Sequence, residues 1–264
     1  MARSQNQPPK HEHRRTRQVL GQNLLADPDA VRRIVQAADL RPEDLVYEVG
    51  AGRGRLTAGL VGRCRHVIAY EVDPVMAVAL TGRPGLTVRT EDFLCAASPG
   101  EPFVVVGNIP YVLTSAVVDW CLRAPTLTSA TLLTQLEYAR KRTGDYGRWS
   151  RLTVSTWPEV SWHLAGRIPR TAFRPVPRVD GGILRLVRRP VPLVQASRLP
   201  AYRSLVDLGF TGVGGSLHAS LSRRYGAARV GRAFRACRLP TDAPVGHVWP
   251  EHWLTLFRLL ESPR

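Results

Sequence analysis

The sequence predicts an α/β protein with a mostly parallel sheet covered by helices on both faces, followed by a small all-helical domain. Two observations predict this architecture. Short apolar runs alternate with segments of helical periodicity over residues 28–134, a rhythm typical of βαβ units. After residue 195, segments of helical pattern follow one another with no strand between them.

The N-terminal segment differs in composition from the rest of the chain. Residues 1–18 are polar and basic, contain Pro8 and Pro9 and lack an apolar period, so they predict a flexible basic arm. The pattern changes at Asp27, because Asp27 is a good N-cap, Pro28 is a good first helical residue and apolar residues then recur at helical spacing. These features predict a helix over residues 28–39.

Alternating strands and helices after residue 44 predict the sheet. The expected strands are short and mainly apolar: Leu45–Val49, Val67–Tyr70, Leu86–Arg89, Phe103–Gly107 and Ala130–Thr134. The expected helices between them lie near residues 55–63, 74–82 and 114–123. Two later β-like runs, Leu152–Trp157 and Ile183–Val187, are expected to close the sheet as an antiparallel pair on either side of a loop rich in Pro and Arg, Ile168–Val179.

A break in the pattern separates the sheet from the helices. Arg188, Arg189, Pro190 and Pro192 interrupt the alternation. We therefore expect a sheet domain over 19–190 and a helical domain over 195–264. Its helices are expected near 198–209, 215–224, 226–236 and 250–261.

The charge of the chain narrows the class of partner. The 264 residues include 37 Lys and Arg against 21 Asp and Glu, giving a formal charge of +16. Such a surplus attracts polyanions, so nucleic acid is the leading partner and an anionic membrane surface the lesser alternative. All the basic residues except Lys10 and Lys141 are arginines, whose planar fork grips phosphate and stacks on bases.

Several function classes are not indicated. No apolar run approaches the ~20 residues that a membrane span needs, and no signal sequence follows the basic start, so we expect a cytoplasmic protein. The four cysteines and seven histidines show no ligand spacing, so we expect no metal. We also expect a monomer.

A glycine-rich turn marks a candidate cofactor site. The strand Leu45–Val49 runs into Gly50-Ala51-Gly52-Arg53-Gly54, with Glu48 two residues before the first glycine. Glycines let the backbone approach a ligand closely. Glu71 stands nineteen residues after Gly52, at the end of the next strand, where a carboxylate can accept both hydroxyls of a ribose.

The details of this turn favour one cofactor. A dinucleotide site would have its third glycine at position 55, where this chain has Arg55. S-adenosylmethionine carries no phosphate and needs a ribose carboxylate and an anchor for its adenine. Asp92, just past the third strand, is placed for that adenine, with Phe93 as a flat apolar neighbour.

The segment Asn108-Ile109-Pro110-Tyr111 indicates the chemistry. It follows an apolar strand at the carboxyl end of the sheet, where ligands bind in such folds. The lone pair of an adenine amine is conjugated into the ring, so the nitrogen attacks a methyl sulfonium poorly. Acceptors on the Asn108 side chain and the Ile109 carbonyl would orient the amine and stabilise the charge that develops on it. Pro110 stiffens the turn, and Tyr111 can stack on the extruded base.

With these residues in view, the chain resembles the erythromycin-resistance (Erm) family of ribosomal RNA adenine N6-methyltransferases, sisters of the small-subunit dimethyladenosine transferases. The resemblance spans most of residues 18–187, and it implies a Rossmann-like class I methyltransferase fold. The matching stretches are Gly21–Leu25, Glu48–Gly54, Glu71, Glu91–Phe93, Asn108–Tyr111 and Phe173–Asp180.

The resemblance also implies roles for particular residues. Tyr111 and Phe173 are expected to sandwich the target adenine. The expected cofactor-binding residues, all toward S-adenosylmethionine, are Gln22, Asn23, Leu25, Gly50, Gly52, Glu71, Val72, Asp92, Phe93 and Asn108. The implied target is one adenine in the peptidyl-transferase loop of large-subunit (23S) ribosomal RNA, met before or during assembly. Its N6 methylation blocks macrolide, lincosamide and streptogramin B binding.

The chain departs from the family pattern at one position and carries one distinctive basic segment. The Gln-Asn-Phe-Leu stretch usual in the family has Leu24 in place of the aromatic residue, which puts cofactor affinity in doubt. The segment 140–149 resembles the Erm branch more than the small-subunit branch and mixes cations with aromatic residues. We expect it to bind RNA through Arg140, Lys141, Arg142, Arg148 and Trp149.

Three alternative functions stay open. The same chemistry could act on small-subunit (16S) ribosomal RNA. The fold could serve a non-catalytic RNA-binding factor, although intact Glu71, Asp92 and Asn108–Tyr111 argue against it. A DNA adenine methyltransferase is less favoured, because nothing resembles a domain that recognises a duplex sequence.

Overall fold

The computed structural model describes residues 23–261, and divides them into two compact units. The first holds the residues up to Gln135 together with Gly166–Ile183; the second holds Leu136–Ala165 and the residues from Leu184 onward. The expected arm, residues 1–18, and the expected cofactor residue Gln22 lie outside the described residues.

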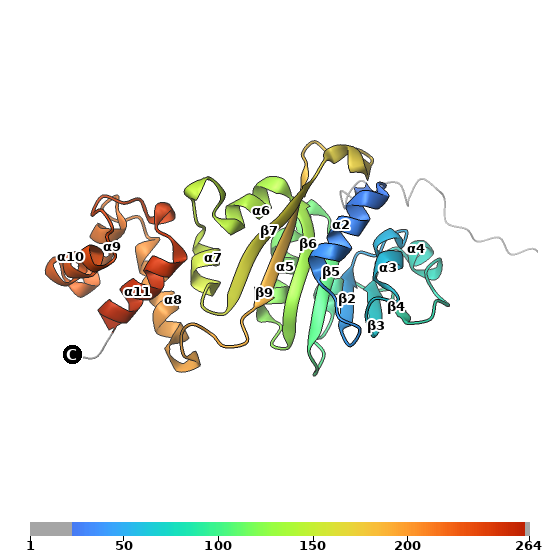
Figure 1. The fold of residues 1–264 in the computed structure, drawn as a ribbon, viewed down its shortest axis with the longest axis horizontal. Coiled ribbons are helices and arrows are strands. Elements are labelled where there is room, and N and C mark those ends of the chain that lie inside the picture. The colour runs from blue at the N-terminus through green and yellow to red at the C-terminus, as the bar shows by residue number, and fades with distance from the viewer. Residues whose placement is uncertain (1–22, 262–264) are drawn as a thin grey trace, which may run out of the picture. The chain divides into compact units, whose positions relative to one another are not determined.

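A parallel sheet forms the centre of the first unit (Figure 1). Its five parallel strands are β2 (Leu45–Val49), β3 (His66–Tyr70), β4 (Leu86–Arg89), β5 (Phe103–Asn108) and β6 (Leu127–Gln135). With β7 (Val160–Ile168) and β9 (Gly181–Arg188), the strand order is β4-β3-β2-β5-β6-β9-β7. The chain proceeds from β2 outward to β3 on one side and returns to β5 on the other, so the strand order reverses between β2 and β5. Ligand sites of open α/β sheets lie at such a reversal.

Helices cover both faces of these strands, as expected for alternating side chains. Val46 and Val104 share a buried core with α2 (Pro28–Ala38) and α3 (Arg55–Leu60). Their sequence neighbours Tyr47 and Phe103 point to the opposite face, where the two rings meet at a tilt with their centroids 4.9 Å apart. There Phe103 also meets Trp120 of α5 (Thr114–Arg123), at 6.0 Å.

Side-chain caps fix where two helices begin. The Asp27 carboxylate accepts a hydrogen bond from the Asp29 amide at 2.9 Å, and α2 starts between them at Pro28. Asp73 caps α4 (Pro74–Val78) in the same way, through the Val75 amide. The sequence-based prediction of both helix starts is confirmed.

The second unit has its own apolar core. It contains the helices α6 (Leu136–Thr143), α7 (Arg151–Thr156), α8 (Leu199–Gly209), α9 (Leu217–Tyr225), α10 (Ala227–Ala236) and α11 (Pro250–Glu261). Tyr202 and Trp253 are completely buried in it, and the Tyr202 hydroxyl donates to the Val154 carbonyl at 2.9 Å. That bond links α7 to α8, so α7 belongs with the later helices. The second unit therefore begins at Leu136, earlier than the domain boundary near residue 190 that the sequence suggested.

Short elements complete the chain. β1 (Leu24–Leu25) and β8 (Phe173–Arg174) pair antiparallel in the first unit. The 3-10 turns are η1 (Phe93–Cys95), η2 (Tyr111–Leu113), η3 (Asp145–Gly147), η4 (Arg170–Ala172), η5 (Ala196–Arg198) and η6 (Val245–His247).

The prediction of a strand at Leu152–Trp157 is wrong. This segment forms most of the helix α7, which starts at Arg151 because Ser150 acts as an N-cap and accepts a hydrogen bond from the Thr153 amide. The cap outweighs the β-branched residues that suggested a strand. The outer strand is instead β7, which follows α7, and α6 was not expected at all.

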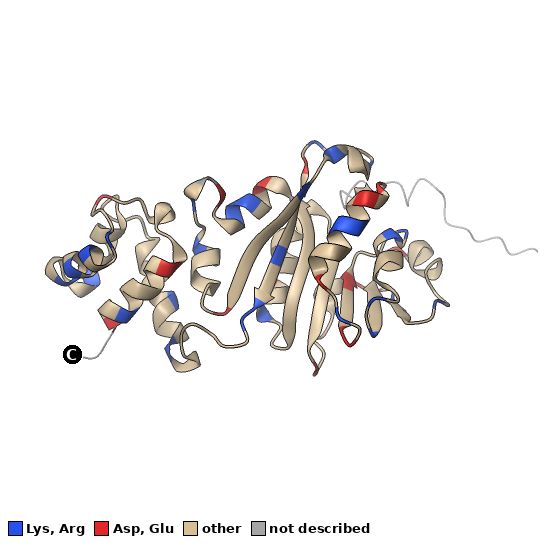
Figure 2. Ribbon diagram, in the orientation of Figure 1, with Lys and Arg blue, Asp and Glu red and all other residues tan. Residues whose placement is uncertain are grey.

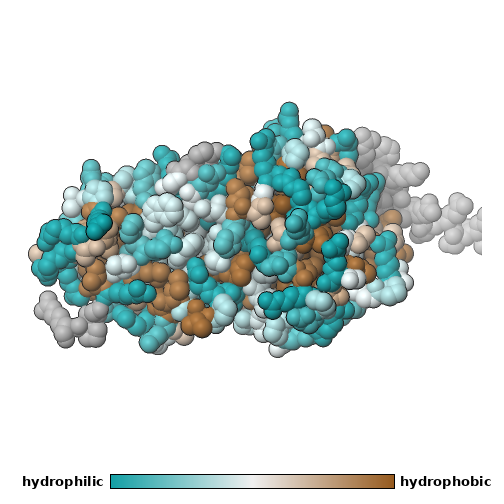
Figure 3. Space-filling view, in the orientation of Figure 1, coloured by the Kyte–Doolittle hydropathy of each residue, from teal (hydrophilic) through white to brown (hydrophobic). Residues whose placement is uncertain are grey.

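Surface properties of the helices bear on the class of partner. Among residues 23–261, no helix is long and apolar enough to cross a membrane. On the face seen in Figure 3, hydrophobic residues form separate patches among hydrophilic ones. The helices α9 and α10 carry clustered cations (Figure 2), and the sequence has no acidic residue between Asp207 and Asp242.

Glu48 is the unusual residue of the central strand. All five residues of β2 are buried, and the Glu48 side chain is only 1% exposed. Burial away from water raises the pKa of Glu48 to about 7, and the nearby carboxylate of Glu71 adds to the rise. The folded protein therefore holds a proton on Glu48 that the unfolded chain releases at lower pH.

This linkage predicts a pH dependence of stability. Since the pKa of Glu48 is higher in the folded state, its stabilising effect is complete below pH 4.5 and is lost as pH rises to about 7. The free energy of unfolding should fall by up to about 3 kcal/mol across this window. In the Glu48→Gln variant, urea unfolding at pH 5 and pH 7.5 should show a smaller fall. Identical pH profiles of the two proteins would contradict the assignment.

Candidate active site

The candidate site lies where β2 and β5 end side by side. Val49 of β2 is in register with Gly107 of β5, so the residues that follow the two strands meet at one edge. After β2 the chain makes a tight turn in which Gly50, Gly52 and Gly54 have φ of 67°, 57° and 74°. At Gly54 a Cβ atom would lie 2.3 Å from the Leu80 side chain, so both the backbone and the space require glycine.

The Glu71 side chain fixes the conformation of this glycine turn through a hydrogen bond. This side chain is 2% exposed, and Oε2 accepts a hydrogen bond from the Gly52 amide at 2.7 Å. Oε1 accepts from the Asp73 amide at 2.9 Å. Each carboxylate oxygen has a further lone pair, so Glu71 is fixed in place and still able to accept a hydrogen bond from a ligand.

Asn108 faces the glycine turn from the end of β5. Its side-chain nitrogen donates to the Asn23 carbonyl at 2.9 Å, and this bond leaves the amide oxygen as an acceptor. Both residues line a recess with Gly50, Gly52 and Glu71. Ile109 and Pro110 line the same recess, and Ile109 is 2% exposed.

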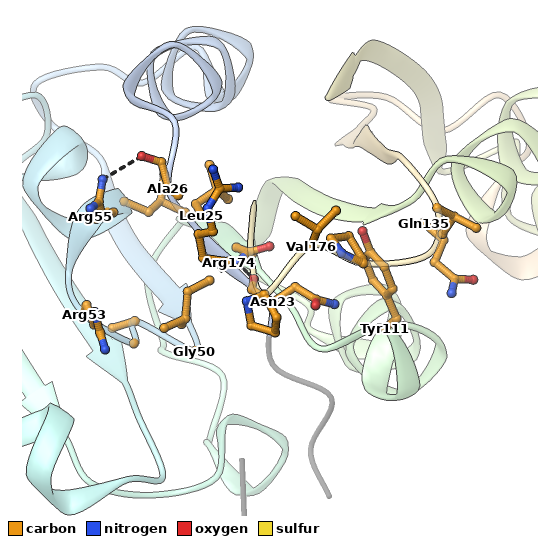
Figure 4. Close-up of a pocket in the computed structure, with 18 of the residues that line it drawn as sticks. Asn23, Leu25, Ala26, Gly50, Arg53, Arg55, Tyr111, Gln135, Arg174 and Val176 are labelled. Carbon is orange, nitrogen blue, oxygen red and sulfur yellow. Dashed lines mark hydrogen bonds between the residues drawn. The ribbon is translucent and has the colours of Figure 1, made fainter. Parts of the chain in front are cut away.

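Tyr111 lies where this recess opens into a larger cavity. The residue lines both, and its burial raises the pKa of Tyr111 to about 12. The phenol therefore stays protonated at neutral pH. Figure 4 shows Tyr111 beside Gln135 and Val176, with Arg53 and Arg55 at the opposite end of the cavity.

The larger cavity has a cationic lining. Its volume is about 1310 Å³, and no Asp or Glu is among its lining residues, all of which belong to the first unit. Four arginines line it: Arg53, Arg55, Arg174 and Arg178. Arg55 donates to the Ala26 carbonyl, and Arg174 donates to Thr171 and Phe173, whereas Arg53 and Arg178 extend from exposed loop positions. Sequence reasoning assigned none of these arginines a role, because the segments that bear them, residues 53–55 and 174–178, meet only in the fold.

The structure brings together most of the expected cofactor residues. Asn23, Leu25, Gly50, Gly52, Glu71 and Asn108 line one or both hollows. Three others line neither. Asp92 is exposed and caps η1 through the Leu94 amide, Phe93 is buried against Tyr70 and Trp120, and Val72 is 46% exposed.

Phe173 is placed differently from expectation. Its ring is completely buried in the core of the first unit, and a Cβ atom on Gly181 would lie 3.3 Å from the ring edge. In this arrangement neither face of the ring is available to a base. The expected stacking role of Phe173 would require the ring to leave the core.

The basic segment of the second unit also differs from expectation. Trp149 is 8% exposed and belongs to the apolar core, so the expected contact with RNA stays a prediction and would require the ring to be uncovered. Arg140 is paired with Asp145 at 2.9 Å, and Arg142 donates to Ser150 at 2.9 Å. Lys141 and Arg148 are exposed.

The described residues 23–261 contain no cluster of His, Cys, Asp and Glu that could hold a metal ion. Three groups line the recess instead: the neutral amide oxygen of Asn108, the fixed carboxylate of Glu71 and the aromatic ring of Tyr111. These groups suit a cofactor with a ribose and a substrate with an amine.

Comparison with known proteins agrees with this chemistry. The chain is 52% identical over 256 residues to an rRNA adenine N-6-methyltransferase of Streptomyces fradiae, and the match covers 95% of this chain and 80% of that protein. It is 38% identical over 240 residues to ribosomal RNA small subunit methyltransferase A of Thermobifida fusca, with coverages of 83% and 81%. The crystal structure of the 23S rRNA methyltransferase ErmE is similar with a TM-score of 0.88 and 50% identity, covering 91% of this chain and 100% of that chain.

The family model for ribosomal RNA adenine dimethylases matches residues 13–262, nearly the whole chain. The match includes the glycine turn, Glu71 and the Asn108–Tyr111 segment. This protein therefore belongs to the ribosomal RNA adenine dimethylase family.

Proposed function

We propose that this protein transfers a methyl group from S-adenosylmethionine to N6 of one adenine in the peptidyl-transferase loop of large-subunit (23S) ribosomal RNA. The methylation gives resistance to macrolides, lincosamides and streptogramin B. The observation that carries the proposal is the Asn108 amide, fixed by Asn23, beside the Glu71 carboxylate. The chain is 50% identical to the 23S rRNA methyltransferase ErmE but 38% identical to the small subunit methyltransferase A, and this difference supports the large-subunit target.

The residues of the recess fit S-adenosylmethionine. Glu71 has acceptor capacity for ribose hydroxyls, and the glycine turn lets backbone groups approach the ligand. Asn23, Leu25 and Asn108 complete the proposed binding set, with Gln22, Val72, Asp92 and Phe93 as further members carried by the family resemblance. When bound, S-adenosylmethionine supplies an electrophilic methyl group on sulfur.

The protein's own groups act on the adenine amine. The Asn108 amide oxygen and the Ile109 carbonyl accept the two N–H bonds of the amine, which directs the nitrogen lone pair toward the methyl group. Because both acceptors are fixed before the reaction, they stabilise the charge that develops on nitrogen without reorganising. Pro110 holds the two acceptors in one turn.

The target base lies against Tyr111 in this proposal. An aromatic ring stacks on any extruded base, and its face also favours a cationic centre. Arg53 and Arg178 at the cavity carry positive charge toward phosphates near the base. Lys141 and Arg148, which belong to the second unit, are exposed cations that can bind RNA phosphates independently. We propose that the protein acts in the cytoplasm, where a ribosomal RNA substrate is found, and that it acts as a monomer.

The substrate assignment is tested in cells. The chain should be expressed in a macrolide-sensitive bacterium, and fragments of both ribosomal RNAs should be analysed by mass spectrometry. We expect added methyl groups on one peptidyl-transferase-loop adenine and a gain of macrolide resistance. Methylation of small-subunit RNA alone would identify the alternative substrate, and an unmodified pair of RNAs would favour a non-catalytic factor.

The Asn108→Ala variant tests the amine acceptor. Removing one such transition-state hydrogen bond costs ~10²–10³ in rate. We expect the methylation rate to fall by this factor, whereas S-adenosylmethionine affinity, measured by calorimetry, should change less. A near wild-type rate would show that Asn108 does not position the amine.

The Tyr111 variants test the stacking role. Loss of a base-stacking ring costs ~1–3 kcal/mol, so Tyr111→Ala should reduce methylation roughly 5- to 100-fold. Tyr111→Phe keeps the ring and removes only a hydroxyl, so it should retain most activity. Equal damage in both variants would assign the effect to the hydroxyl instead.

A further inference from the structure

Trp249 is an exposed tryptophan in a protein that buries the others. Its side chain is 52% exposed, whereas Trp120, Trp149, Trp162 and Trp253 are at most 8% exposed and Trp157 is half-buried. Trp249 stands immediately before the helix α11 of the second unit. Because a single exposed apolar residue is common on protein surfaces, the case for a ligand depends on what supports and surrounds this ring.

The ring of Trp249 packs against a buried aromatic residue of the second unit. Its centroid lies 5.3 Å from that of Trp149, which in turn lies 5.6 Å from that of Trp157. The Trp149 amide donates to the Gly246 carbonyl at 2.7 Å, which fixes the segment that leads to Trp249. Gly144 also packs against Trp149, since a Cβ atom there would lie 2.4 Å from the ring. The Trp249 ring is tilted by 58° to Trp149, and Trp149 meets Trp157 edge to face, so Trp249 is the exposed outer ring of an aromatic cluster.

Cationic residues lie close in sequence to this aromatic cluster. Arg148 is exposed and immediately precedes Trp149, whose amide donates to the Gly246 carbonyl. Lys141 is also exposed, one helical turn before Gly144. Of the nearby acids, Asp145 is engaged by Arg140, and Glu251 lies two residues after Trp249. The surroundings thus suit a ligand that has both flat rings and phosphates.

We propose that Trp249 stacks on an unpaired base of the RNA substrate, with Arg148 and Lys141 on the adjoining phosphates. The proposal rests on the proposed function for the identity of the RNA. Trp149, which sequence reasoning expected at the RNA, has a supporting role in this arrangement. A protein partner is less favoured, because the other exposed large apolar residue of α11, Leu259, is ten residues and ~15 Å along the helix from Trp249.

The test uses the full chain and a fluorescent transcript of the peptidyl-transferase stem-loop. Binding is measured by anisotropy for wild type, Trp249→Ala, Trp249→Leu and Trp249→Phe. We expect the Ala and Leu variants to bind RNA roughly 5- to 100-fold more weakly, because both lack a ring, and Phe to stay within a few-fold of wild type. Leu259→Ala is the matched control, since it also shortens an exposed apolar side chain linked to α11, and it should bind normally.

A scan of abasic nucleotides identifies the partner base. At one unpaired position, removing the base should weaken binding to wild type but cause no further loss in Trp249→Ala. Unchanged RNA affinity of Trp249→Ala, equal retention by Leu and Phe, or losses that add at every position would overturn the proposal. Thermal unfolding and S-adenosylmethionine binding should match wild type in the Leu and Phe variants, which separates stacking from folding.

Methylation of the same transcript by the wild-type protein is measured in a separate experiment that tests the proposed function. Its absence would count against the proposed function, while the binding series still decides the role of Trp249.

Discussion

The parallel pairing of β2 with β5 is the constraint on which the site depends. These strands are neighbours in the sheet but are separated in the chain by β3 and β4, so two segments more than fifty residues apart end at the same edge. The glycine turn follows one strand and Asn108 ends the other. A shift of one residue in this register would turn Glu48 and Val106 out of their buried face and carry Asn108 away from the turn. Packing of side chains on the two faces of the sheet therefore also fixes the position of Asn108 relative to the glycine turn.

Much of this arrangement was predictable from sequence because its signals are local. Asp27 and Asp73 start helices through their own neighbouring amides, and the apolar runs of β2 and β5 have few alternatives once buried on both faces. The glycine turn and Asn108 are placed by the ends of those strands. Their proximity was predictable because the carboxyl ends of neighbouring parallel strands lie at the same edge of the sheet.

The differences between expectation and structure concern information that is not local in the sequence. Leu152–Trp157 has the composition of a strand, and only the cap from Ser150 and the packing of α7 under Tyr202 make it a helix. Phe173 and Trp149 lie in motifs that suggest contact with a ligand, yet both rings fill cores. A sequence names an aromatic residue but not which of its faces is covered. The same holds for Arg140, whose charge is engaged by Asp145.

The choice of an amide at position 108 follows from its surroundings. Glu48 and Glu71 already place two carboxyl groups near this edge of the sheet, and the pKa of Glu48 is raised to about 7 mainly by burial and to a smaller degree by Glu71. A third carboxylate would meet further repulsion, and it would also oppose the Asn23 carbonyl, which now accepts a hydrogen bond from the Asn108 nitrogen. An amide avoids both costs, because one end donates to Asn23 while the other end accepts. The nitrogen end fixes the side chain, and this leaves a neutral oxygen of defined direction for the amine of the substrate.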